Sequence, residues 1–219
     1  MKERKLYPQK ADEVIKELTN ANSYEIDQFA KHYPEEIFKF SESFSAAFKG
    51  YLELKHFAEK NITKDKPISQ VDYINFFCYQ IFDNLFTSFK ILLMGFQTAS
   101  GNLMRQVAEG VAIVILCANT FNIKRTEKKG KKINTKEFYY YNAFKEGKSY
   151  AKAHRAIQLL DENKDTIGIS DYGIEILKLL KEQNNANSHP NMWSTSAFIS
   201  IGKPGKMYIG GCFDEGKIG

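Results

Sequence analysis

The sequence contains few of the residues that interrupt regular secondary structure: 14 glycines and 5 prolines in 219 residues. Because many short strands joined by turns need such residues, their scarcity favours long helices. Cysteine is also scarce. Three cysteines, an odd number with no two at two-residue spacing, do not supply the disulfide framework of a small secreted domain. An apolar core must hold the chain together, and the chain is long enough to bury one.

Long apolar runs are missing as well, and we expect no secretory leader. The N-terminus MKERKLYPQK is charged and leads into no apolar stretch, so it predicts no secretory signal. The most apolar run, residues 110–118, is shorter than the about 20 residues that a bilayer-spanning helix needs. Cys78 and Cys117 lie inside apolar runs, which is typical of buried thiols in a reducing compartment. We therefore expect a cytoplasmic protein with no membrane partner.

Several common catalytic motifs are absent. The sequence has no glycine-rich phosphate loop and no Gly-x-Ser-x-Gly element. Glu53-x-x-His56 has the spacing of carboxylate-bridged di-iron bundles, but those need a second such pair on a facing helix, and the sequence has none. Four histidines without clustered cysteines do not favour zinc. We expect no metal and no other cofactor.

Aromatic residues are abundant, with 17 Phe and 12 Tyr, so the core should be built from large rings. Apolar residues at spacings of three and four predict helices, and Ser100 is expected to cap one of them at its N-terminus. The predicted helices cover residues 11–18, 25–31, 36–60, 70–94, 102–120, 148–160 and 171–187.

The pattern changes after Pro190. Two short apolar segments, residues 198–201 and 207–209, flank a Pro-Gly turn and predict a β-hairpin. An isolated hairpin is marginal in water, so it should lie against the helices. The sequence thus predicts a mainly α fold, a multi-helix bundle over residues 1–190 with a small C-terminal β-hairpin over residues 191–219.

Arg105 and Glu109 are four residues apart in a predicted helix, so they share a face and can form an ion pair. Their line continues through apolar residues, which places the pair in a partly buried environment. Burying such charges costs several kcal/mol unless partners satisfy them. Two interpretations stay open: a structural clamp between helices, or part of a functional site.

The segment 183–190 is rich in hydrogen-bonding side chains that propagate helices poorly, so a helix should end there. Pro190 disfavours helical geometry at His189. A histidine at the C-terminal end of a helix meets the negative end of the dipole, which favours its protonated form. Such a group suits a general acid, or a cation for a phosphate. The alternative is a polar helix cap whose histidine packs beneath the hairpin.

Arg105-x-x-x-Glu109 on a long helix, together with a polar run that ends in His189-Pro190, resembles the HEPN superfamily. It is especially similar to a bacterial branch related to phage-abortive-infection proteins. The resemblance covers about residues 74–214 and depends on short motifs. It implies an all-α, commonly dimeric protein. Many HEPN proteins are metal-independent ribonucleases of toxin–antitoxin, abortive-infection or CRISPR defence systems.

The catalytic motif of that superfamily is an arginine, usually followed by a polar residue, and then a histidine. His189 matches the histidine and Asn184 the polar residue, whereas Gln183 stands at the arginine position. Glutamine lacks the permanent charge and forked donors that arginine offers a scissile phosphate, so another basic group would have to substitute. The resemblance implies that His189 assists proton transfer, that Asn184 orients the phosphate, and that Arg105 with Glu109 shapes the pocket.

A basic segment, residues 124–132, contains one acid, Glu127. Three consecutive tyrosines, residues 139–141, follow it. Lysines that neutralise phosphates and rings on which bases stack are ingredients of single-strand binding. At least one of the three rings should lie in the core, and a solvated loop between helices is the alternative for the basic segment. The candidate RNA-binding residues are Lys124, Arg125, Lys128, Lys129, Lys131 and Lys132.

The net charge of +5 permits contact with nucleic acid without requiring it. We predict a HEPN-like protein that cuts or binds RNA in bacterial defence or a toxin–antitoxin system. Its expected partners are RNA, an antitoxin or other protein, and a second copy of the chain in a homodimer. A catalytically inert module that binds a protein or a nucleotide remains the alternative, which Gln183 favours.

Overall fold

The computed structural model describes residues 12, 15, 18–19, 21–61, 69–129, 132–188, 211 and 213–214. The chain divides into two compact units, the first from residues 1–46, 85–103 and 183–219, and the second from residues 47–84 and 104–182. The elements are α2 (Ser23–His32), α3 (Pro34–Asn61), α4 (Gln70–Leu93), α5 (Gln97–Ala118), β1 (Ile123–Lys129), β2 (Lys132–Phe138), α6 (Tyr140–Lys145), the 3-10 helix η1 (Ser149–Ala151), α7 (Ala153–Glu162), α8 (Lys164–Ile167) and α9 (Asp171–Ser188).

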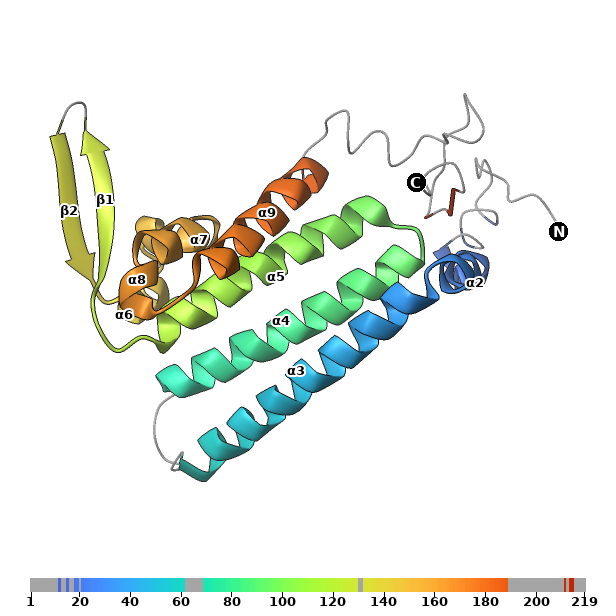
Figure 1. Cartoon of the computed structure of the whole chain (residues 1–219), viewed down its shortest axis with the longest axis horizontal. Helices are drawn as coiled ribbons and strands as arrows, with labels where there is room; N and C mark the ends of the chain where they lie inside the picture. The colour runs from blue at the N-terminus through green and yellow to red at the C-terminus, as the bar shows by residue number, and fades with distance from the viewer. Residues whose placement is uncertain are drawn as a thin grey trace. The chain divides into compact units, whose positions relative to one another are not determined.

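The fold is mainly α with a small two-stranded antiparallel sheet, and the predicted helical class is confirmed. Helices α2, α3, α4 and α9 lie where the apolar spacing predicts them (Figure 1). Helix α5 begins earlier than predicted, at Gln97, so Ser100 lies inside it and not at its N-cap. The Ser100 carbonyl accepts a hydrogen bond of 2.9 Å from the Ser88 hydroxyl, which joins α4 to α5 within the first unit.

Aromatic rings join α3 to α4 in the first unit, as the composition predicts. The rings of Phe40 and Phe89 stack with centroids 3.8 Å apart, and those of Phe44 and Phe86 are 5.6 Å apart. Asn22 adds a polar tie, because its side-chain amide donates a hydrogen bond of 2.7 Å to the backbone carbonyl of Met94. Ring packing and this bond therefore fix the helix ends that form the unit.

Helix α5 is long and apolar enough to cross a membrane, judged by its length and composition alone. Its most apolar 18-residue window has a mean hydropathy of 1.3, and 44% of that window is buried in the structure. The central helix of a soluble bundle has the same properties, because it is apolar on most of its faces.

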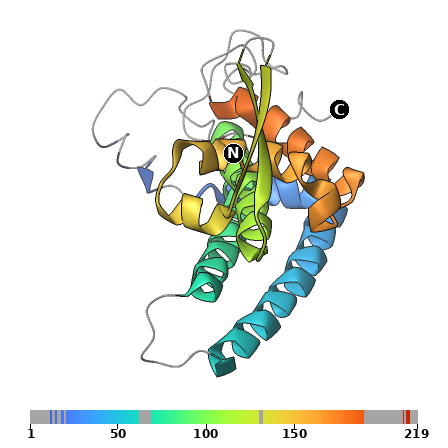
Figure 2. The ribbon, with the colours of Figure 1, turned by 90° about the vertical axis from the view of Figure 1, so that its left-hand side faces the viewer.

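Residues 124–129 of the basic segment belong to a β-strand, which differs from the predicted loop between helices. This strand forms an antiparallel hairpin in which Ile123 pairs with Phe138 and Lys129 with Lys132 (Figures 1 and 2). Neither strand alternates apolar with polar residues. At the base of the hairpin, Ile123 is buried. The next helix, α6, begins after the hairpin, at Tyr140. The predicted C-terminal hairpin lies outside the described residues.

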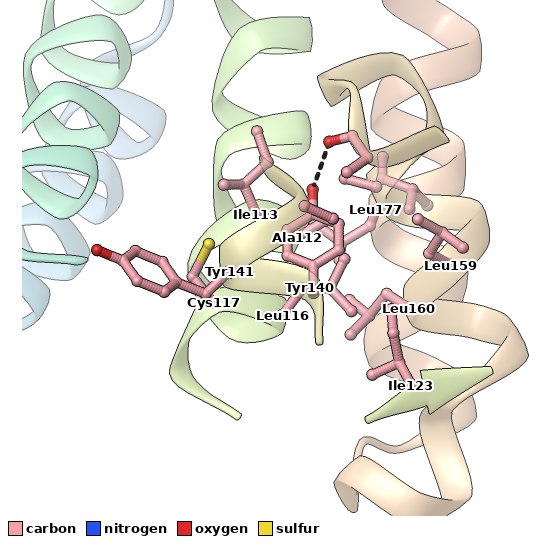
Figure 3. Packing of buried hydrophobic residues seen from close by; sticks show 14 of the residues in the cluster. Ala112, Ile113, Leu116, Cys117, Ile123, Tyr140, Tyr141, Leu159, Leu160 and Leu177 are labelled. Carbon is pink, nitrogen blue, oxygen red and sulfur yellow. Dashed lines mark hydrogen bonds between the residues drawn. The ribbon is translucent and has the colours of Figure 1, made fainter. Parts of the chain in front are cut away.

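The core of the second unit gathers side chains from α5, α6, α7, α9 and the start of β1 (Figure 3). Tyr140 is at its centre, 1% exposed, and its hydroxyl donates a hydrogen bond of 3.1 Å to the backbone carbonyl of Ala151. Cys117 is fully buried, as the sequence predicts, and burial raises the pKa of its thiol to about 12. Cys78 is half-buried.

Candidate functional site

Arg105 and Glu109 form the predicted ion pair on α5. Nε of Arg105 lies 3.6 Å from Oε1 of Glu109, and the two side chains are 26% and 8% exposed. A separation of 3.6 Å is too long for a hydrogen bond. Within the described part of the chain, Nε of Arg105 is buried without a hydrogen-bond partner, and the Glu109 carboxylate accepts no hydrogen bond. The pair is close in space but loosely held.

Glu109 lines a cavity of about 220 Å³ inside the second unit. Four side chains at the cavity can form hydrogen bonds, two from α4 and two from α5. The exposed pair, Gln80 and Gln106, is at the mouth, while Asn84 is half-buried and Glu109 is buried. The remaining lining residues are Phe77, Ile81, Gly110, Ile113, Phe144 and Ala153.

Gly110 fixes how closely α4 and α5 approach beside this cavity. A Cβ atom at this position would lie 2.9 Å from Cγ1 of Ile81, closer than real Cβ contacts. The Ile81 side chain would therefore have to shift if a larger residue replaced Gly110 at this crossing.

The other two predicted catalytic residues are not described together with this pair. Asn184 is partly buried on α9 and belongs to the first unit, whereas Arg105 and Glu109 belong to the second. His189 lies outside the described residues. Of the four predicted catalytic residues, the structure thus brings together Arg105 and Glu109.

The hairpin places its basic residues differently from a loop. A guanidinium nitrogen of Arg125 lies 2.9 Å from Oε1 of Glu127, and Nζ of Lys136 lies 3.9 Å from Oε2 of the same carboxylate. The Arg125 guanidinium also lies over the ring of Tyr150, 5.1 Å from its centroid. Lys124 is exposed and pairs in register with Glu137. Lys128, Lys129 and Lys132 belong to the strands, and Lys131 lies outside the described residues.

A cleft of about 510 Å³ lies between this hairpin and α7. Three of its residues are cations and one is an anion, so its formal charge is 3 − 1 = +2. Arg155 is exposed, and among the described residues its guanidinium forms no ion pair. The lining residues are Arg125, Thr126, Glu127, Lys136, Arg155, Gln158 and Leu159.

Lys136 and Arg155 are not among the residues that the sequence predicts for RNA binding. The helical spacing of α7 does put Arg155 on the same face as Gln158 and Glu162, which are also exposed. Nothing in that spacing shows that a hairpin covers the face. The sequence therefore indicates that Arg155 is exposed, but it contains no pattern that predicts the cleft.

Asn163 holds the hairpin against the end of α7. Its Oδ1 accepts a hydrogen bond of 2.7 Å from the Lys124 amide, and its Nδ2 donates bonds of 2.8 Å to the Lys124 carbonyl and 2.7 Å to the Leu159 carbonyl. Glu162 adds a bond of 3.1 Å from the Thr126 amide. Since Asn163 is 4% exposed, its three bonds are largely shielded from water and set the position of the cleft wall.

The three consecutive tyrosines do not form a surface for base stacking. Tyr140 is 1% exposed and Tyr141 is 8% exposed, so the prediction of a core ring is confirmed. Tyr139 packs against the same core, and its hydroxyl donates a hydrogen bond of 2.7 Å to Oε1 of Gln70. Bases could stack on Tyr140 or Tyr141 only after local unfolding.

No protein-family model, curated protein or solved structure matches the chain. The HEPN resemblance therefore rests on the motif residues alone. Within the described ranges, no group of three His, Cys, Asp or Glu side chains is placed to hold a metal ion.

Proposed function

We propose that this HEPN-like protein binds RNA and that the cleft between the hairpin and α7 receives the phosphate backbone. The observation that supports the proposal most directly is that Arg125, Lys136 and Arg155 line one cleft, in which Glu127 is the single lining carboxylate. A polyanion gains from such an excess of charge by releasing its condensed counterions. Arginine adds a planar fork that can contact two phosphate oxygens at once.

The Arg125 guanidinium is held in place before any ligand binds. Glu127 contacts Arg125 and Lys136, and the Tyr150 ring supports the flat face of the Arg125 guanidinium. Less side-chain entropy is then lost when phosphate binds. Arg155, exposed and without an ion pair in the described chain, is the group that phosphate can contact without breaking an existing pair.

Neutralising this cleft should weaken RNA binding more than an equal loss of charge elsewhere. The double variant Lys136→Ala/Arg155→Ala should raise the Kd for a short single-stranded RNA at least about tenfold, since charged hydrogen bonds contribute about 1.5–3 kcal/mol each. It should also lower the slope of log Kd against log salt concentration by about 1.4, or about 0.7 for each phosphate that is no longer neutralised. Fluorescence anisotropy measures both.

Lys39→Ala/Lys55→Ala is the matched control, because it removes two exposed lysines from surface ion pairs with Glu35 and Glu59. It should change the Kd less than about twofold. Equal weakening by the two double variants would show that net charge alone determines the RNA affinity. The assignment of the cleft would then be wrong.

RNA cleavage is the part of the proposal that depends on the resemblance. The same RNA, incubated with the protein in EDTA, should be cut by the wild type and left intact by His189→Ala. Equal cleavage by both would exclude the role of His189 as proton donor. Binding without cleavage by the wild type would favour the inert module.

Self-association as a homodimer in a cytoplasmic defence protein completes the proposal. Support for a protein partner comes from large apolar side chains that α3 and α4 expose in the second unit, since exposed apolar surface favours association. The exposed apolar side chains are Leu52, Leu54, Phe57, Val71, Phe76 and Tyr79. Sedimentation of the purified chain measures the oligomeric state directly.

A further inference from the structure

The cavity beside Glu109 is bordered by a carboxylate that accepts no hydrogen bond from the described residues. The side chain of Glu109 is 8% exposed, and within the described chain its only polar contact is with Arg105, at 3.6 Å. Among the described residues, the Glu109 oxygens are not fully enclosed, whereas Nε of Arg105 is, so the carboxylate is open to water or to a ligand. This carboxylate borders a cavity, where a ligand can supply the missing donors.

Three carboxamides share the cavity with Glu109, and none of them is committed elsewhere. Gln80, Asn84 and Gln106 form no side-chain hydrogen bond among the described residues. Each carboxamide offers two donors and one acceptor oxygen. The cavity thus presents a charged acceptor together with a mixed set of donors and acceptors, all unused.

The charge balance argues against a cationic ligand. Arg105 already lies beside Glu109 and neutralises it, so an ammonium or guanidinium ligand would leave a net positive charge in a buried site. Such a ligand would also offer only donors and would leave the carboxamide donors unpaired. A neutral ligand with two adjacent donors and separate acceptors satisfies more of the cavity.

We propose that this cavity binds a single guanine base. Of the nucleobases, guanine alone presents two adjacent donors on one edge, its N1–H and its exocyclic amino group, and a carboxylate accepts both in parallel. Its O6 and N7 atoms are acceptors, which the carboxamide donors can satisfy. Adenine and cytosine place an acceptor beside a single amino donor, so they would set an acceptor against the Glu109 carboxylate.

The size and walls of the cavity suit a base and not a whole nucleotide. Sites for drug-sized ligands occupy about 300–1,000 Å³, and this one occupies about 220 Å³. Phe77 and Phe144 line it, with ring centroids 5.4 Å apart, and supply aromatic surface for a flat heterocycle. The sugar and phosphate would remain outside the mouth, at the exposed Gln80 and Gln106.

Titration with nucleosides tests this pocket without involving phosphate binding. Guanosine should bind at least about tenfold more tightly than inosine, which lacks the amino group, because a hydrogen bond to a charged acceptor contributes about 1.5–3 kcal/mol. Adenosine should bind more weakly still. Calorimetry or ligand-observed NMR measures these affinities. Equal affinity for guanosine and adenosine, or no guanosine binding at millimolar concentration, would overturn the proposal.

Two variants assign the binding to this cavity. Glu109→Gln keeps the shape of the side chain but replaces one acceptor oxygen with a donor, so guanosine affinity should fall at least about tenfold. Gln106→Ala at the exposed mouth should weaken binding by a smaller factor without disturbing the core. Glu175→Gln removes an exposed carboxylate from α9 and should leave affinity unchanged. Unchanged guanosine affinity in both cavity variants would contradict the assignment.

The base can come from an RNA strand or from a free guanine nucleotide, and RNA oligonucleotides distinguish the two. A preference for guanine-containing over uridine-only RNA that disappears in Glu109→Gln identifies the strand as the source. Binding of guanosine monophosphate without such a preference identifies the free nucleotide. The two proposals can fail separately. Lys136→Ala/Arg155→Ala should leave guanosine affinity intact, so guanosine binding can be shown even if RNA binding by the cleft is disproved.

Discussion

Tyr140→Ala should lower the free energy of unfolding by about 4 kcal/mol, because large-to-small changes at buried aromatic positions cost about 3–5 kcal/mol. The ring is 1% exposed and stacks on Phe144 with centroids 5.9 Å apart. Its removal leaves a cavity among the side chains that join α5 to α7, and it leaves the Ala151 carbonyl without its 3.1 Å bond. The melting temperature should fall by about 10 °C. Denaturant and thermal unfolding followed by circular dichroism measure both quantities.

Two further tyrosine variants separate the contributions. Tyr140→Phe keeps the ring and removes only the hydroxyl, so it should cost about 1 kcal/mol. Tyr172→Ala changes a side chain that is 73% exposed on α9 and should cost less than about 0.5 kcal/mol. If Tyr140→Ala were no more harmful than Tyr172→Ala, the position of Tyr140 at the centre of the core would be wrong.

Asn163→Leu should cost about 3 kcal/mol and release the hairpin from α7. Leucine has a similar size but cannot replace any of the three hydrogen bonds to Lys124 and Leu159, and each buried group left unpaired costs about 1–3 kcal/mol. Amide hydrogen exchange should show faster exchange at Lys124 and along β1. The RNA affinity of Asn163→Leu should also fall, because one wall of the cleft loses its fixed position.

Asn134→Leu is the control for this change, because it makes the same substitution at an exposed position of β2. It should alter unfolding by less than about 0.5 kcal/mol. Asn163→Asp keeps the acceptor for the Lys124 amide and loses both donated bonds, so its effect should be intermediate. Unchanged exchange at Lys124 in Asn163→Leu would show that this asparagine does not hold the hairpin.

The candidate site was predictable only where its geometry depends on one helix. Four-residue spacing puts Arg105 and Glu109 on one face of α5 whatever surrounds that helix, so their ion pair could be read from the sequence. The remaining polar groups of the cavity are Gln80 and Asn84 of α4 and Gln106, which lies one turn before Glu109 on α5. In the sequence, Gln80 and Asn84 are ordinary polar positions of an amphipathic helix, and the cavity that they share with Glu109 forms where α4 packs against α5 beside Gly110.

The sequence by itself determined the helical class, the limits of most long helices and the aromatic character of the core. It could do so because a repeat of three to four residues is a local property that survives in any packing. Tertiary structure alone decided the hairpin and the cleft. The strands that contain Arg125 and Lys136 have no apolar alternation, and Asn163, some 39 residues beyond Lys124 in the chain, binds the backbone of β1. Such a contact depends on the folded path of the chain, and no local pattern encodes it.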